Sequence, residues 1–226
     1  SEYYIATKCG CPSGGGKHVY TRDNLFRGLH QSLKRLKTDH IDVMQLHGGS
    51  VEEIQKSGTV EVLEEMRRQG KVRWIGASIS TLDKGVTLPP FLSWDSFDAF
   101  QIPYSALMRK HENWISASSK VGAGTIIRFG VAQGEPKKGS GNEEVWGKFD
   151  QAKLDELRNS GESRTSFMLR FTLSHPQIDT IIVGTQNLVH LGENVNAALC
   201  GPLPPNVYSE AKKRLDEVGL NPTKAL

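Results

Sequence analysis

Residues 3–8 read Tyr-Tyr-Ile-Ala-Thr-Lys and residues 41–47 read Ile-Asp-Val-Met-Gln-Leu-His, two short apolar runs that each close on a polar side chain. The segment between them has the apolar spacing of a helix, so the unit is predicted to be strand, helix, strand. Parallel strands joined in this way share a carboxyl edge, and active sites lie at that edge. Lys8 and His47 are therefore expected to emerge on the same side of one sheet.

The composition narrows the class of protein. The chain has 226 residues, of which 37% are hydrophobic, enough for one domain with a buried core. Its net charge of +3 is small, which argues against nucleic acid or a membrane surface as partner. Three cysteines cannot build a disulfide framework, and neither a signal peptide nor a membrane-spanning run is evident. A cytoplasmic protein is expected.

Strand-like runs alternate with helix-period segments along the chain, the pattern of an α/β fold with a parallel sheet. A final amphipathic helix is expected at residues 207–218, after a proline-rich break. The expected strands are residues 3–8, 41–47, 72–78, 99–104, 125–129 and 180–183.

The connection from Arg128 to about Gly161 is too long for a simple turn. Connections of this length usually form lids or are disordered, and we favour a lid over a bound ligand. Trp146 would then help to shape a substrate pocket.

Two loop motifs could indicate a metal or redox site and a phosphate-binding loop, but neither motif is specific. Cys9-Gly-Cys11 lacks a second cysteine pair to complete a zinc site and is not the Cys-x-x-Cys redox spacing. The glycine run at residues 14–16 lacks the rest of a phosphate-loop signature. A flexible loop between strand and helix explains both better, so no metal is expected. The basic group Lys34, Arg35 and Lys37 fits the carboxyl end of a helix.

Six stretches, in order, resemble the aldo-keto reductase family over nearly the whole chain. Members of that family are eight-stranded (β/α) barrels of the TIM type that reduce aldehydes and ketones with NADP(H). The resemblance therefore implies a single barrel-type domain, an oxidoreductase activity and a small carbonyl substrate. The six stretches are Ile-Ala-Thr-Lys-Cys at 5–9, Asp-Val-Met-Gln-Leu-His at 42–47, Gly-Lys-Val-Arg-Trp-Ile-Gly at 70–76, Phe-Gln-Ile-Pro-Tyr at 100–104, Thr-Leu-Ser-His-Pro at 172–176, and Ile-Val-Gly-Thr at 182–185 with Glu-Asn-Val at 193–195.

The resemblance also assigns roles. Lys8 matches the family's active-site lysine, which lowers the pKa of a tyrosine proton donor, and His47 matches the histidine that orients the carbonyl. Ser78 and Gln101 resemble residues that hold the nicotinamide carboxamide. The adenosine end of the cofactor is expected at Gly184, Thr185, Asn187, His190, Glu193 and Asn194, where a helix start can meet phosphate.

The chain also departs from the family pattern. The first two βα units, which supply the catalytic tyrosine and an aspartate, have no counterpart, so six of eight units are expected. Tyr3 and Tyr4 precede Lys8 on its own strand by roughly 13 to 17 Å, too far for a hydrogen bond. Arg128 stands where many members stack an aromatic ring on nicotinamide. A guanidinium can also lie flat against a ring or meet a pyrophosphate, so Arg128 is expected to contact the cofactor.

Two further departures bear on the cofactor and on partners. Ile79 replaces the usual asparagine after Ser78, and His190 replaces a frequent arginine for the ribose phosphate, so NADP is preferred over NAD only modestly. Six strands would form an arc with two exposed edges, which favours association, including a homo-oligomer. A catalytically impaired nucleotide-binding or scaffold protein of the same fold is therefore the alternative to an enzyme.

Overall fold

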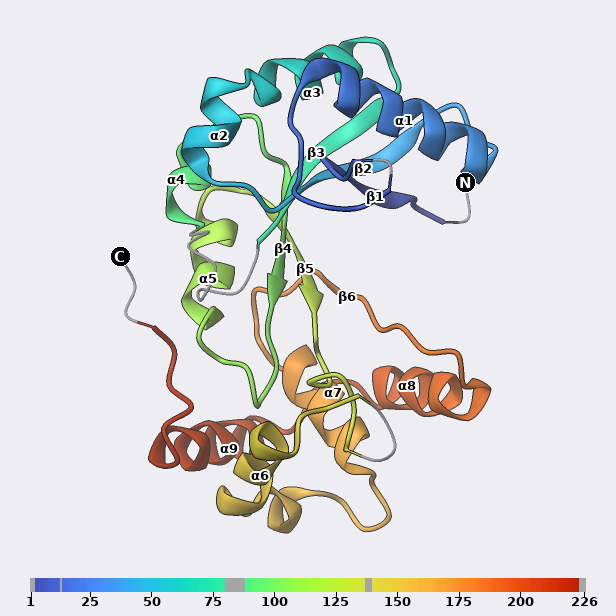
Figure 1. Cartoon of the computed structure of the whole chain (residues 1–226). Coiled ribbons are helices and arrows are strands. Elements are labelled where there is room, and N and C mark those ends of the chain that lie inside the picture. Colours follow the sequence, from blue (N-terminus) through green and yellow to red (C-terminus); the bar gives the residue numbers. More distant parts are fainter. Residues whose placement is uncertain (1–2, 13, 80–87, 137–139, 224–226) are drawn as a thin grey trace. The chain divides into compact units, whose positions relative to one another are not determined.

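The computed structural model describes residues 3–12, 14–79, 88–136 and 140–223, and strands alternate with helices through these ranges (Figure 1). The second and third strands have the predicted bounds, whereas the first begins three residues later than predicted and the last ends two residues earlier. The strands are β1 (Ala6–Cys9), β2 (Ile41–His47), β3 (Val72–Ser78), β4 (Ala99–Pro103), β5 (Gly124–Arg128) and β6 (Thr180–Ile181).

Helices occupy most connections between the strands. They are α1 (Arg22–Leu36), α2 (Val51–Lys56), α3 (Thr59–Arg68), α4 (Pro89–Leu92), α5 (Glu112–Lys120), α6 (Glu143–Gln151), the 3₁₀ helix η2 (Leu154–Leu157), α7 (Arg164–Leu173), α8 (Leu188–Cys200) and α9 (Pro205–Glu217). Among the described residues, no helix is both long enough and apolar enough to cross a bilayer.

The strands follow the order β1-β2-β3-β4-β5-β6, which is also their order in the chain. The neighbours β1–β2, β2–β3, β3–β4 and β5–β6 pair in parallel. This arrangement confirms the predicted α/β fold with a parallel sheet. The structure groups the chain into two compact units, and the expectation of a single domain stays a prediction.

The first unit comprises Ser1–Gln101 and Ala117–Thr125. Alternate residues of its strands, such as Met44 and Leu46 in β2 and Ile75 in β3, are completely buried. Helices α1 and α3 contact the sheet on β1 and β3, and they bury Leu29 and Met66 in turn (Figure 1). Each such side chain contributes about 1.5 to 3 kcal/mol on burial, so this face of the sheet holds the unit together. The opposite face is left to carry polar side chains.

The second unit comprises Ile102–Ser116 and Ile126–Leu226. Its core contains an aromatic cluster, in which Phe149 stacks on Trp146 with ring centroids 5.8 Å apart and meets Phe167 edge-on at 6.0 Å. Trp146 and Phe149 lie on α6, so the connection predicted as an irregular lid contains a helix and a 3₁₀ turn packed into the core.

The final helix, α9, is held by an ion-pair network in the second unit, in which Arg109 and Glu112 are buried. The guanidinium of Arg109, 1% exposed, donates to Glu112 Oε2 at 2.8 Å and to Asp216 Oδ1 at 2.7 Å. Lys212 of α9 also donates to Glu112. Because each buried charge has a partner, the helix is fixed by electrostatics as well as by the burial of Leu215.

Candidate active site

Three predicted site residues form a row across neighbouring strands of the first unit, and two of them, His47 and Ser78, are the last residues of their strands. His47 is in register with Ser78, and Ser78 is in register with Gln101. In a parallel sheet, paired residues point to the same face, so these three side chains share one face at one edge. The structure thereby brings together the predicted histidine and both predicted nicotinamide contacts.

Lys8 lies on the same face, one side-chain step further from the edge. It is in register with Gln45 of β2, and Gln45 and His47 are two residues apart and so point to the same side. Gly76 occupies the equivalent position on β3. A Cβ atom built there would lie 3.1 Å from the Gln45 side chain and 2.8 Å from the Ala99 carbonyl, so only glycine fits between these strands. Lys8 itself is half-buried.

The Ser78 and Gln101 side chains are hydrogen-bonded to each other. Ser78 Oγ donates to Gln101 Oε1 at 3.1 Å, and both residues are buried. This bond fixes the orientation of the Gln101 carboxamide. Its NH₂ group therefore points away from Ser78 and can donate to a ligand. A fixed amide donor is the group needed to hold the carbonyl of another carboxamide, such as that of nicotinamide.

His47 is positioned by the loop that follows β1. Cys11 Sγ lies 3.0 Å from His47 Nδ1, and the Tyr20 hydroxyl donates to the His47 carbonyl oxygen at 3.0 Å. When the thiol is the donor, Nδ1 accepts and the proton of the neutral ring resides on Nε2. That tautomer presents an N–H group to a substrate oxygen.

Tyr20 is a structural residue in this arrangement. Burial raises its pKa well above the ordinary value, with a smaller contribution from nearby Glu53. Its hydroxyl is already committed to a carbonyl oxygen, and a raised pKa makes a phenol a weaker proton donor. Tyr20 therefore does not replace the proton donor that the family pattern calls for.

The second unit contains a groove that collects the residues predicted for the adenosine end of a cofactor. It runs between residues 129–135 and residues 182–194, with Ser140, Ser163 and Thr165 on its wall. All six predicted residues line it: Gly184, Thr185, Asn187, His190, Glu193 and Asn194. The structure thus groups these side chains as the sequence predicts, and their binding role stays a prediction.

The amino end of α8 opens into this groove. Asn187 caps the helix by accepting a hydrogen bond from Val189 N at 2.8 Å, and Thr185 Oγ1 accepts from Asn187 N at 3.1 Å. The remaining amides of a first helical turn, together with the positive end of the helix dipole, favour an anionic ligand. A phosphate group suits this end of the groove.

The remaining two predicted site residues, Arg128 and Trp146, lie in neither of these two groups. Arg128 ends β5, and its guanidinium lies over the Phe129 ring, 4.5 Å from the centroid. Burial lowers the pKa of Arg128. Trp146 is buried in the core, and its indole donates to the Ala132 carbonyl at 3.3 Å. Its substrate role stays a prediction.

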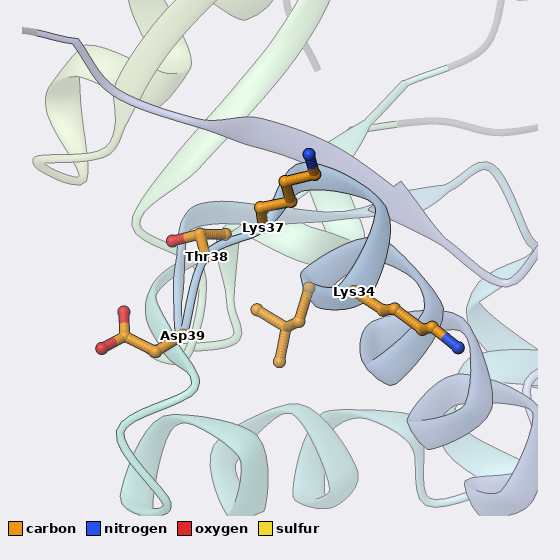
Figure 2. Close-up of a pocket in the computed structure, with 5 residues that line it drawn as sticks. Lys34, Lys37, Thr38 and Asp39 are labelled. Atoms are coloured by element: carbon orange, nitrogen blue, oxygen red, sulfur yellow. The ribbon is translucent and has the colours of Figure 1, made fainter.

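A shallow hollow near the carboxyl end of α1 carries little chemistry. It is lined by Leu33, Lys34, Lys37, Thr38 and Asp39. Figure 2 shows the two ammonium groups and the Asp39 carboxylate pointing away from one another. Because its charged groups diverge, this hollow fits the predicted basic helix end better than a binding site.

The structure adds three residues that the sequence reading did not select. Gln45 is 2% exposed, and its Oε1 has no hydrogen-bond partner among the described residues. A glutamine inside an apolar strand was the signal for it, because a buried amide needs a partner. Cys11 and His18 lie beside His47, but their spacing in the sequence matches no known ligand motif.

Comparisons with known proteins agree with this geometry. The family model described as "Aldo/keto reductase family" matches residues 1–216. The chain is 27% identical over 214 residues to the uncharacterized oxidoreductase YqkF of Bacillus subtilis, covering 87% of this chain and 69% of that protein. It is also 27% identical over 215 residues to L-galactose dehydrogenase of Arabidopsis thaliana, covering 87% and 64%. The chain thus spans about two thirds of the length of these relatives.

A solved structure shows the same fold. The holo form of aldo-keto reductase AKR11C1 from Bacillus halodurans matches with a TM-score of 0.76 over 93% of this chain and 72% of that chain, at 24% identity. This likeness confirms the predicted fold class, an α/β fold of the barrel type.

Proposed function

Because the chain belongs to the aldo/keto reductase family, we propose that the complete protein reduces an aldehyde or a ketone by hydride transfer from NADP(H). The observation that carries the proposal is the placement of Lys8, His47, Ser78 and Gln101 on one face of neighbouring parallel strands, with His47 and Ser78 at the carboxyl ends of theirs. Carboxyl edges of parallel strands are where enzymes of this architecture place their chemistry.

Each unit offers donor groups suited to one part of a nicotinamide dinucleotide. Gln101, oriented by Ser78, is suited to the carboxamide, and the α8 end of the second unit's groove is suited to phosphate. When bound, the cofactor supplies the hydride. His190 lines the groove and is the candidate contact for a ribose phosphate, which supports NADP over NAD.

Two residues of the chain, His47 and Lys8, polarise the substrate carbonyl and tune the group that protonates its oxygen. His47 donates from Nε2 to the substrate oxygen and polarises the carbonyl. The Lys8 ammonium lowers the pKa of the hydroxyl that protonates this oxygen, because a nearby cation favours the phenolate. The resemblance assigns that hydroxyl to a tyrosine of the family's earlier βα units, and the proposal therefore concerns the complete protein.

The Lys8→Met variant tests the assignment. We expect it to lower kcat with a generic aldehyde by about 10²- to 10⁴-fold, the usual contribution of proton-transfer catalysis. NADPH affinity, measured by quenching of tryptophan fluorescence, should stay within about twofold, because the ammonium acts on the proton donor. Lys56→Met, at the exposed end of α2, is the matched control and should change neither quantity. Unchanged turnover in Lys8→Met would remove this lysine from the mechanism.

The same assay separates the enzyme from the alternative, a nucleotide-binding or scaffold protein of this fold. NADPH binding without aldehyde-dependent NADPH oxidation in the complete protein would favour the alternative. Absence of both binding and oxidation would reject the cofactor assignment altogether.

A further inference from the structure

Three side chains with metal-binding atoms meet beside the carboxyl end of β2. The Cys11 Sγ atom and ring nitrogens of His18 and His47 all lie within 4.8 Å of one another. The His18 and His47 rings are 4.6 Å apart between centroids. Cys11 and His18 are exposed and His47 is half-buried, so an ion could reach the cluster from solvent.

The loop that carries Cys11 and His18 is anchored at both ends. Val19 N donates to the Gly10 carbonyl at 2.7 Å, which closes the loop, and Asn24 Nδ2 donates to the Val19 carbonyl at 2.7 Å. Tyr20 then ties the loop to the third candidate ligand through its bond to the His47 carbonyl. The three donors are therefore presented by one braced scaffold.

Close packing of glycines supports that scaffold. A Cβ atom at Gly10 would lie 2.9 Å from the Tyr20 ring, and one at Gly49 would lie 2.6 Å from its hydroxyl oxygen. A Cβ atom at Gly48 would lie 3.7 Å from His18 Nδ1, which places that imidazole over the turn after β2. The absence of side chains at these positions allows the loops to approach.

We propose that Cys11, His18 and His47 bind a divalent ion of the zinc class, with a fourth coordination position open to water. One thiolate and two imidazoles form a donor set that zinc prefers over the oxygen ligands that suit magnesium or calcium. Tetrahedral bond lengths require ligand atoms about 3.4 to 3.6 Å apart. The Cys11–His47 distance of 3.0 Å must open by about half an ångström, and exposed side chains can adjust that far. Binding releases the thiol proton to solvent.

The ion has a consequence for turnover that rests on the proposed function. Because Cys11 Sγ faces His47 Nδ1, zinc would bind through Nδ1 and keep the ring proton on Nε2, the atom that the proposed function directs at the substrate oxygen. Bound zinc should therefore preserve this donor and should not abolish turnover. The binding site itself is independent of any activity. If the protein binds the metal but shows no reductase activity, this inference stands and the proposed function is rejected.

Cobalt is the spectroscopic probe for the site. We expect the reduced, full chain to bind one Co²⁺ ion with a thiolate-to-cobalt charge-transfer band and the intense visible bands of tetrahedral cobalt, and Zn²⁺ to bleach both. Cys11→Ser should abolish the charge-transfer band, and His18→Ala should weaken Co²⁺ binding more than about 10-fold.

Matched controls use the same residue types elsewhere. Cys200→Ser removes the other exposed thiol, and His40→Ala removes a histidine that pairs with Asp39; both should leave the spectrum and affinity unchanged. The inference is overturned by a spectrum without a thiolate band, by a band that survives Cys11→Ser, or by loss of the band in Cys200→Ser.

Discussion

Gly49 combines a left-handed backbone with an immediate neighbour, which explains why a glycine must follow β2 here. Its φ is +97°, and an added Cβ atom would lie 2.7 Å from the Tyr20 ring. The close approach of the Tyr20 ring therefore requires glycine at this position.

A pair of glycine substitutions separates this packing effect from backbone entropy. Gly49→Ala should destabilise the protein by about 1 to 3 kcal/mol, because it forces both a strained φ and a displaced tyrosine. Gly28→Ala, inside α1 with no atom within 4 Å of the new Cβ, should instead stabilise it by about 0.5 to 1 kcal/mol. Urea unfolding measures both. Equal effects of the two substitutions would contradict the close packing on Tyr20.

The three cysteines should differ sharply in reactivity. Cys9 is 3% exposed, and burial raises the pKa of its thiol to about 12, with a smaller contribution from Cys11. Because the thiolate is the nucleophile, Cys9 should resist iodoacetamide at pH 8, whereas exposed Cys11 and Cys200 react. Mass spectrometry of the folded chain should find two carbamidomethyl groups. Labelling of Cys9 as fast as Cys200 would show that its burial is wrong.

At the scale of single elements, the sequence predicted strands best where a polar residue ends an apolar run. The bounds of β2 and β3 follow from His47 and Ser78, whereas β6 is only two residues long and lacks such an end signal. The helix α6 was missed because glycines and lysines dominate the preceding stretch. Asn142, which caps α6 by accepting from Val145 N at 3.0 Å, was the available signal.

The Arg109 network gives a prediction about acid stability. Burial raises the pKa of Glu112, but hydrogen bonds from Lys212 and Arg109 more than offset it, so the pKa lies below the ordinary value of 4.5. A carboxyl with a lowered folded pKa contributes its full stability above the unfolded pKa and loses it as the pH falls through the folded pKa. Glu112 should therefore be one source of acid unfolding, with its contribution lost below about pH 4.5.

Glu112→Gln checks that contribution. It should lower the free energy of unfolding at pH 7 by roughly 3 kcal/mol, because Arg109 stays buried with one carboxylate fewer. The variant should also lose less stability than the parent between pH 7 and pH 3. Exposed Glu217→Gln serves as the control and should reproduce the parent's pH profile. An unchanged pH profile in Glu112→Gln would exclude this carboxylate as a source of acid sensitivity.

At the scale of the whole molecule, the order of the strands in the sheet was predictable, because connections between parallel strands are local. The six strands occur in the sheet in sequence order, and the predicted site residues of the first unit, Lys8, His47, Ser78 and Gln101, lie on strands. The division into two compact units and the Cys11–His18–His47 cluster were not predictable, since both depend on loop conformations that leave no periodic pattern.

The groove of the second unit should bind the adenosine part of the cofactor, and substitutions of residues that line the groove test this prediction. Adenosine 2′,5′-bisphosphate, the adenosine half of NADP, should bind the full chain, and Asn194→Ala should weaken its binding. His190→Ala should lower affinity for the bisphosphate by about 10-fold, the worth of a hydrogen bond to a charged group, while leaving adenosine 5′-monophosphate binding unchanged. Ser78→Ala, which alters the first unit, should change neither constant in calorimetry. If His190→Ala weakened both nucleotides equally, the histidine would contact a part that they share, and the preference for NADP would lose its physical basis.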